Sequence, residues 1–203
     1  AERRLTVSDW PELELLPTRS GGIWQEDSEH HEHADLDPHL WLDAGNAVRI
    51  IEGITDRLAK LDPAHAETYR QNAASGIERI KAADAAVSRQ LQTAKPKPYW
   101  VLHDTLQYFE HRYGLNPAGT IMVSPERKPG AKRMLALRAQ LRTQGIACIL
   151  YEPRYGRRWI DIMIEGSAAQ AIPIDPLGLE IESGGYNYEK LLLNLAAQLA
   201  ACK

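Results

Sequence analysis

The chain has 203 residues, of which 44% are hydrophobic and 25% charged, as in an ordinary soluble globular protein. A formal net charge of −3, with no basic stripe, argues against nucleic-acid binding. No apolar run reaches the ~20 residues that cross a membrane, and no signal peptide is present, so we expect a mature protein or a trimmed chain.

The first 36 residues contain a polar, histidine-rich loop. Pro11 and Pro17 interrupt the apolar residues of the first 20 positions, so short extended pieces are expected there. Residues 21–36 have no hydrophobic period and carry three histidines among acidic residues: His30, His31 and His33. This run is either a solvated acidic loop or an auxiliary metal trap that feeds a main site.

A stiff turn follows at Asp37-Pro38-His39. Pro38 fixes its own φ and pushes Asp37 into an extended conformation, and the next three residues, Leu40 to Leu42, should pack into a core. A histidine on such a turn suits a metal site, because the ring is aimed before the metal arrives. Taken alone, however, His39 would more often be a structural histidine.

Two helices are expected in the next segment. Apolar residues recur at three- and four-residue steps and predict a core-facing stripe: Val48, Ile51, Ile54, Leu58 and Leu61. Asp62-Pro63 then suits the start of a second helix from Ala64 to about Thr93, with Asp62 as its N-cap. Its ~30 residues would form a rod of ~45 Å, which is long enough to link two structural units.

Strands and helices alternate in the rest of the chain. Strands are predicted at 99–102, 120–123, 146–151 and 171–174, and helices at 105–113, 132–143, 158–165 and 188–201. This alternation indicates an α/β fold, a parallel sheet flanked by helices. Ligands bind at the carboxyl ends of such strands, where His103 follows the first strand and Asp175 the fourth. Asp175-Pro176 is also typical of a simple turn.

His39, His103 and Asp175 together are predicted to form a metal site. Two imidazoles and one carboxylate favour Zn²⁺, with Mn²⁺ as the alternative if more oxygen ligands join.

Other candidates are given structural or surface roles. Glu152 follows the third strand and could point into the same cleft, but it is interpreted as structural, and His65 and His111 are interpreted as surface residues. The sequence has no phosphate-binding loop, no nucleophile elbow and no His-Glu-x-x-His motif. We therefore expect no enzymatic activity. A metal-dependent hydrolase is the less favoured alternative, because it would need a general base and no residue of the sequence is a specific candidate for that role.

Cys148 and Cys202 are the only cysteines. They are either two unrelated small core residues or one disulfide that ties the C-terminal helix to an internal strand. The second alternative would indicate an oxidising compartment.

Short motifs run through nearly the whole chain after the histidine-rich loop: Asp37-Pro38-His39-Leu40-Trp41-Leu42-Asp43 with Asn46, Leu61-Asp62-Pro63 with Tyr69 and Asn72, His103-Asp104, Tyr108-Phe109-Glu110, Tyr113-Gly114-Leu115, Ser124-Pro125-Glu126 with Pro129-Gly130, Cys148, Glu152-Pro153, Ile174-Asp175-Pro176-Leu177-Gly178 and Cys202. In this order they resemble the periplasmic or lipid-anchored solute-binding proteins of ABC importers for zinc and manganese.

The resemblance implies two α/β lobes joined by a long rigid helix, with a metal bound between the lobes. It further implies that His39, His103 and Asp175 are metal ligands and that Cys148 and Cys202 form a disulfide. It also implies a periplasmic or extracellular, lipid-anchored protein that catalyses nothing and hands its metal to a membrane permease. A stand-alone periplasmic zinc chaperone or buffer is the alternative.

Most of the family's N-terminal lobe, with a further histidine ligand, has no counterpart in this sequence. We therefore expect residues 1–44 to be a remnant of that lobe, 45–96 to be a helical segment with the linking helix, and 97–203 to be the C-terminal α/β lobe. A water molecule or a loop histidine would then complete the metal coordination. The surface left by the missing lobe should expose apolar residues and favour dimerisation.

Overall fold

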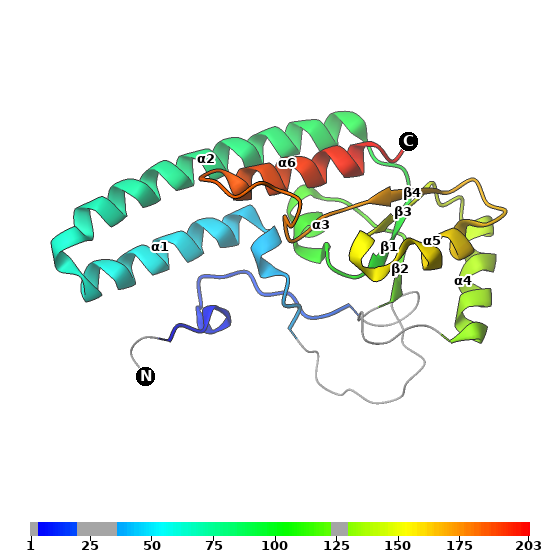
Figure 1. Ribbon diagram of the computed structural model, residues 1–203, viewed down its shortest axis with the longest axis horizontal. Coiled ribbons are helices and arrows are strands. Elements are labelled where there is room, and N and C mark those ends of the chain that lie inside the picture. The colour runs from blue at the N-terminus through cyan, green and yellow to red at the C-terminus, as the bar shows by residue number, and fades with distance from the viewer. Residues whose placement is uncertain (1–3, 20–35, 123–129) are drawn as a thin grey trace.

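A parallel four-stranded sheet lies at one end of the computed structural model, which describes residues 4–19, 36–122 and 130–203 (Figure 1). The strands are β1 (Tyr99–His103), β2 (Gly119–Met122), β3 (Cys148–Tyr151) and β4 (Gln170–Pro173), in the spatial order β2-β1-β3-β4. Val101 of β1 is in register with Thr120 of β2 and Leu150 of β3. The predicted parallel sheet is confirmed, and its four carboxyl ends lie along one edge.

Helices cover both faces of this sheet, which explains the continuous apolar runs of β1 and β3. Tyr99, Val101 and Leu150 face a core formed with α2 (Ala66–Ala94), α3 (Gln107–Tyr113) and α6 (Asn187–Ala200). Trp100 and Ile149 face a second core formed with α4 (Ala131–Thr143) and α5 (Arg157–Ile164). Because successive side chains of a strand point to opposite faces of the sheet, the apolar residues of each strand alternate between the two cores.

Two long helices, α1 (Ala44–Leu61) and α2 (Ala66–Ala94), run antiparallel away from the sheet (Figure 1). The core-facing stripe predicted for α1 is right only near the sheet, where Val48 and Ile51 pack against the core. Ile54, Leu58 and Leu61 are 39%, 39% and 53% exposed, so for them the prediction was wrong. The reason is that this half of α1 extends beyond the sheet and packs mainly on α2.

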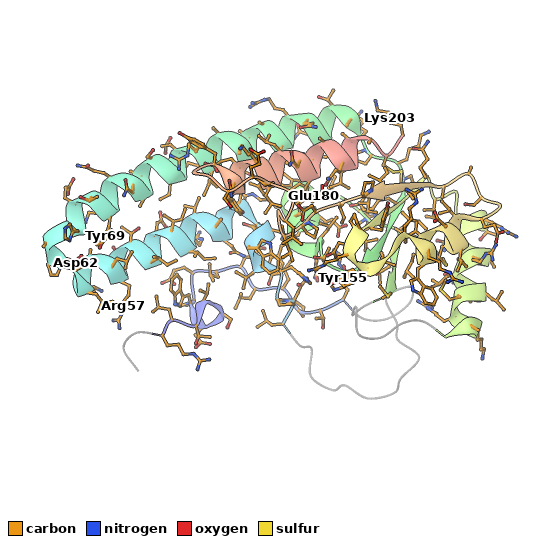
Figure 2. All side chains as sticks on the ribbon, viewed as in Figure 1. Arg57, Asp62, Tyr69, Tyr155, Glu180 and Lys203 are labelled. Atoms are coloured by element: carbon orange, nitrogen blue, oxygen red, sulfur yellow. A yellow bond between two sulfur atoms is a disulfide. The ribbon has the colours of Figure 1, made fainter. Side chains whose placement is uncertain are left out.

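Asp62 lies at the junction of the two helices, followed by the 3-10 turn η4 (Pro63–His65). Asp62 is the N-cap residue of η4, with Pro63 in the first turn as expected, but its side chain makes no capping hydrogen bond, and α2 itself has His65 at its N-cap. Instead the carboxylate accepts a hydrogen bond from the Tyr69 hydroxyl at 2.8 Å and contacts His65 at 2.8 Å (Figure 2). The Tyr69–Asp62 hydrogen bond joins the connection between α1 and α2 to the first turn of α2.

The segment before the histidine-rich loop is mostly extended, as expected, apart from the 3-10 turn η1 (Val7–Asp9). Trp10 packs on α1 at Gly53, where an added Cβ would approach the indole ring to 2.4 Å. Pro17 forms an antiparallel bridge with Leu36. With a hydrogen bond from the Asp37 N–H to the Leu16 carbonyl, this bridge joins the segment before the histidine-rich loop to the turn that carries His39.

Cys148 and Cys202 form a disulfide across 54 positions, with their Cα atoms 5.8 Å apart and both residues buried. The bond joins β3 to the end of α6 and confirms the predicted pairing. Within the described ranges, no helix combines the length and the apolar character needed to span a membrane.

Reduction of this disulfide should destabilise the protein by about 4 kcal/mol, because an open loop of this length has far more conformational entropy in the unfolded chain. Urea unfolding with and without reductant measures the difference. The double variant Cys148→Ala/Cys202→Ala should show no response to reductant. An unchanged urea midpoint for the reduced wild type would contradict the expectation.

Candidate metal site

His39 lies on a turn that its own sequence stiffens. The Asp37 carboxylate accepts a hydrogen bond from the His39 backbone N–H at 2.9 Å and contacts ring atom Nδ1 at 2.7 Å through the same oxygen. The 3-10 turn η3 (Leu40–Leu42) follows, and Leu42 is fully buried. The ring is thus oriented by a carboxylate two positions earlier, on a backbone anchored in the core.

Contacts from distant parts of the chain also fix this turn. The Trp41 indole N–H donates to the Pro176 carbonyl at 3.1 Å, next to Asp175. The Tyr188 hydroxyl of α6 donates to the Trp41 carbonyl at 2.7 Å. The loop after β4 and the last helix therefore hold the His39 turn against the sheet.

His103 is the last residue of β1 and is only 8% exposed. Its Nδ1 atom lies 3.2 Å from Glu152 Oε1, directly after β3. Arg154 Nε donates to the other oxygen of that carboxylate at 2.9 Å. The sequence interpretation preferred a structural role for Glu152 over a place in the cleft and so did not predict this contact. Its place after β3, like those of His103 and Asp175 after β1 and β4, was the signal that could have found it.

The two histidines come together although 64 positions separate them: their ring centroids are 5.2 Å apart, with an interplanar angle of 70°. A carboxylate engages Nδ1 of each ring, so Nε2 is the nitrogen that can bind a metal. Each nitrogen would lie about 2.1 Å from a bound Zn²⁺, and two rings on one ion would have centres roughly 5 Å apart. The observed spacing fits that arrangement.

Asp175 lies in a turn after β4, where its Oδ2 accepts a hydrogen bond from the Glu180 backbone N–H at 2.9 Å. It lines a pocket of about 120 Å³ together with Glu152. In the part of the chain that the structure describes, no three His, Cys, Asp or Glu side chains are grouped so that they could hold a metal ion. Asp175 thus shares a pocket with Glu152, the residue that contacts His103, and its role as a ligand stays a prediction.

The other histidines divide into two groups. His65 and His111 are exposed and contact Asp62 and Glu14, as expected for surface residues. The predicted auxiliary histidines, His30, His31 and His33, lie outside the described residues.

Buried charges lie directly beside His103. Arg19 forms ion pairs with Glu110 and, at 3.6 Å, with Asp104, while the Tyr99 hydroxyl donates to Glu110 at 3.0 Å. Burial raises the pKa of Asp104 to about 7, although the Arg19 charge opposes the shift. Burial also raises the pKa of Glu110. These groups tie the segment before the histidine-rich loop to β1 and α3.

The order of the motifs agrees with comparisons with known proteins. A family model described as "Zinc-uptake complex component A periplasmic", ZnuA, matches residues 4–202. The chain belongs to the ZnuA family. The high-affinity zinc uptake system protein ZnuA of Brucella abortus is 37% identical over 168 residues, which are 83% of this chain and 50% of that protein. The chain thus spans about half the length of the ZnuA relatives it matches.

Solved structures share the fold of this ZnuA family member. AdcAII of Streptococcus pneumoniae superposes with a TM-score of 0.71 at 24% identity, covering 86% of this chain and 66% of AdcAII. FpvC of Pseudomonas aeruginosa in complex with Mn²⁺ gives 0.74 at 18% identity, covering 95% of this chain and 68% of FpvC. The lobe of a solute-binding protein, expected from the sequence, is therefore confirmed as the fold.

The raised pKa of Asp104 predicts that the stability of the metal-free protein falls between about pH 4 and pH 7. In this window the native state keeps a proton that the unfolded chain, with an ordinary carboxyl pKa near 3.8, has lost. Asp104→Asn should remove most of the fall, leaving the part due to Glu110. At pH 8 its free energy of unfolding should exceed that of the wild type by on the order of 2–5 kcal/mol, the value of ~3 pKa units.

Urea unfolding from pH 4.5 to 8 tests this expectation. Asp56→Asn, at an exposed position of α1, is the control and should follow the wild-type profile. Parallel profiles for Asp104→Asn and the wild type would refute the assignment.

Proposed function

We propose that this chain captures a divalent transition metal, Zn²⁺ in preference to Mn²⁺, for delivery to the permease of an ABC importer. The observation that carries the proposal is the pair His39 and His103, whose rings are 5.2 Å apart. Two imidazole nitrogens favour Zn²⁺, whereas Mn²⁺ prefers sites with more oxygen ligands. The complex of FpvC with Mn²⁺ keeps Mn²⁺ as the alternative cargo.

The third proposed ligand is Asp175. It follows β4 at the edge of the sheet where β1 and β3 present His103 and Glu152. The Trp41–Pro176 hydrogen bond connects its turn with that of His39. To reach the ion, the Asp175 carboxylate would exchange the Glu180 backbone N–H for the metal.

Asp37 and Glu152 act as orienting groups in this proposal. Each holds the Nδ1 side of one imidazole, at 2.7 and 3.2 Å, and so presents Nε2 to the cargo. Carboxylates in this position also make a ligating imidazole more basic, and loss of one typically costs 10–100-fold in metal affinity.

We place the protein in the periplasm or, with a lipid anchor, outside the cell. The family description supports this location, as does the buried disulfide, which persists in oxidising compartments. Binding without catalysis is the proposed role, because the ZnuA family consists of transport proteins that bind a substrate.

Zinc titration tests the ligand set. Competition with a chromogenic chelator should give one tightly bound Zn²⁺ per chain. His39→Ala and His103→Ala should each lower the affinity at least ~100-fold, because a ligand contributes no less than an orienting partner does. Asp175→Ala should weaken binding in the same direction.

His65→Ala and His111→Ala are the matched controls, since each removes an exposed imidazole that pairs with a carboxylate other than Asp37 and Glu152. Both should bind Zn²⁺ as the wild type does. Wild-type affinity in His103→Ala would disprove the proposed site.

A further proposal is that His30, His31 and His33 form an auxiliary trap for the same metal. The triple variant with alanine at all three positions should bind Zn²⁺ more weakly than the wild type, or at fewer sites, because up to three imidazole ligands are lost. Isothermal titration at matched ionic strength measures both quantities. Identical isotherms would remove the loop from the proposal.

A further inference from the structure

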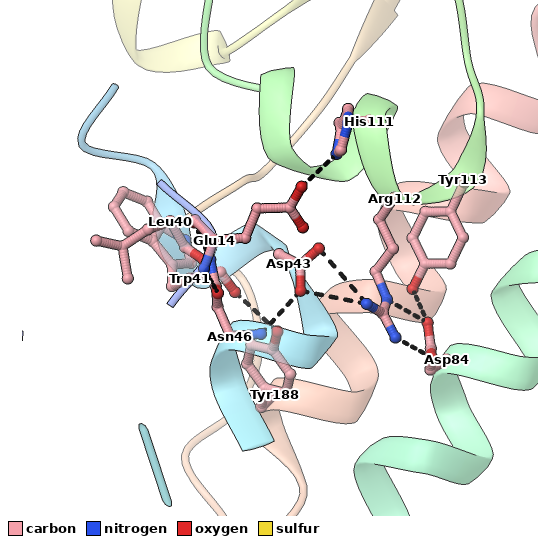
Figure 3. A network of polar contacts seen from close by, with 10 residues as sticks. All are labelled: Glu14, Leu40, Trp41, Asp43, Asn46, Asp84, His111, Arg112, Tyr113 and Tyr188. Carbon is pink, nitrogen blue, oxygen red and sulfur yellow. Dashed lines mark hydrogen bonds and ion pairs between the residues drawn. The ribbon is translucent and has the colours of Figure 1, made fainter. Parts of the chain in front are cut away.

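Arg112, in the last turn of α3, joins three elements through one guanidinium (Figure 3). Its Nε donates to Asp84 Oδ1 on α2 at 2.7 Å, and a terminal nitrogen donates to Asp84 Oδ2 at 2.5 Å. The Tyr113 hydroxyl donates to Asp84 at 2.8 Å. This bidentate arrangement fixes direction as well as distance.

The other terminal nitrogen of Arg112 contacts Asp43 at 3.3 Å. Asp43 ends the turn that begins at His39, and its carboxylate caps α1 by accepting a bond from the Asn46 backbone N–H at 2.8 Å. The Asp43 side chain is only 4% exposed, so an unpaired charge there would be costly. Arg112 is the partner that compensates it.

α3 also connects Arg112 with His103. The chain turns sharply after β1, with a hydrogen bond from the Thr105 N–H to the His103 carbonyl at 2.8 Å, and α3 begins at Gln107. The segments that follow His39 and His103 therefore meet at one side chain. Gly45 leaves room for it, because an added Cβ would lie 2.8 Å from the Arg112 guanidinium.

We propose that Arg112 is a positioning residue for metal binding: by pairing with both Asp43 and Asp84 it fixes the separation of His39 from His103. This inference rests on the proposed function, because it assigns that site its geometry. A guanidinium is suited to the role, since it stays charged and its planar fork reaches two carboxylates at once. A lysine would keep the charge but lose the fork.

The test compares Arg112→Ala with Arg79→Ala. Arg79, on α2, likewise forms an ion pair between two elements, with Glu189 of α6 at 2.8 Å, but its ion pair involves neither histidine turn. Arg112→Ala should lower Zn²⁺ affinity about tenfold or more, as loss of an outer-shell partner does. Arg112→Lys should restore little of it, and Arg79→Ala should leave it within twofold.

A second readout needs no metal. In the metal-free protein, the nuclear Overhauser effect between the His39 and His103 ring protons reports their separation directly. Arg112→Ala should weaken this signal and Arg79→Ala should preserve it, even if both variants lose similar thermal stability. If Arg112→Ala does not fold, Asp84→Asn serves instead. It keeps the ion pair between Arg112 and Asp43 but weakens the bidentate contact between Arg112 and α2, so it should reduce the ring-to-ring signal and the Zn²⁺ affinity by a smaller amount.

An unchanged ring-to-ring signal and affinity in Arg112→Ala would overturn the inference, as would equal losses in Arg79→Ala, which would indicate general destabilisation. A wild type that binds no Zn²⁺ would refute the proposed function. In that case the metal-free signal still decides whether Arg112 fixes the two rings.

Discussion

The parallel pairing of β1 with β3 is the constraint on which the candidate site depends. Because all strands run the same way, their carboxyl ends meet at one edge, and this register brings His103 to within 3.2 Å of Glu152. Burial of both strands between two cores leaves the edge little freedom to shift. A histidine at such a place is aimed by the sheet before any ligand arrives.

His39 reaches this edge from outside the sheet, and its position is the product of long-range polar contacts. Trp41 bonds to the loop after β4, Tyr188 brings in α6, and Arg112 adds α2 and α3. Each contact satisfies a buried or half-buried polar group that would otherwise be costly. Several elements therefore hold the turn at once. This explains how His39 can be positioned accurately although it does not lie on a strand.

The neighbourhood of the histidines is rich in buried carboxylates, and this has a physical cost. Asp37, Asp43, Asp104, Glu110 and Glu152 are all nearly inaccessible to solvent. Arg19, Arg112 and Arg154 offset part of that charge, yet the pKa of Asp104 still rises to about 7 because burial outweighs the opposing charge of Arg19. A bound divalent cation would add positive charge where the protein supplies too little, which fits a metal-binding role.

The sequence by itself determined the strands, the helices and the parallel sheet, because hydrophobic period and chain alternation are local properties. It also nominated His39, His103 and Asp175, since a proline-stiffened turn and strand ends can be read along the chain. Only the tertiary structure decided that the two imidazoles are adjacent, that Glu152 orients one of them, and that Ile54, Leu58 and Leu61 are exposed. These outcomes depend on which distant residues become neighbours, and periodicity carries no information about that.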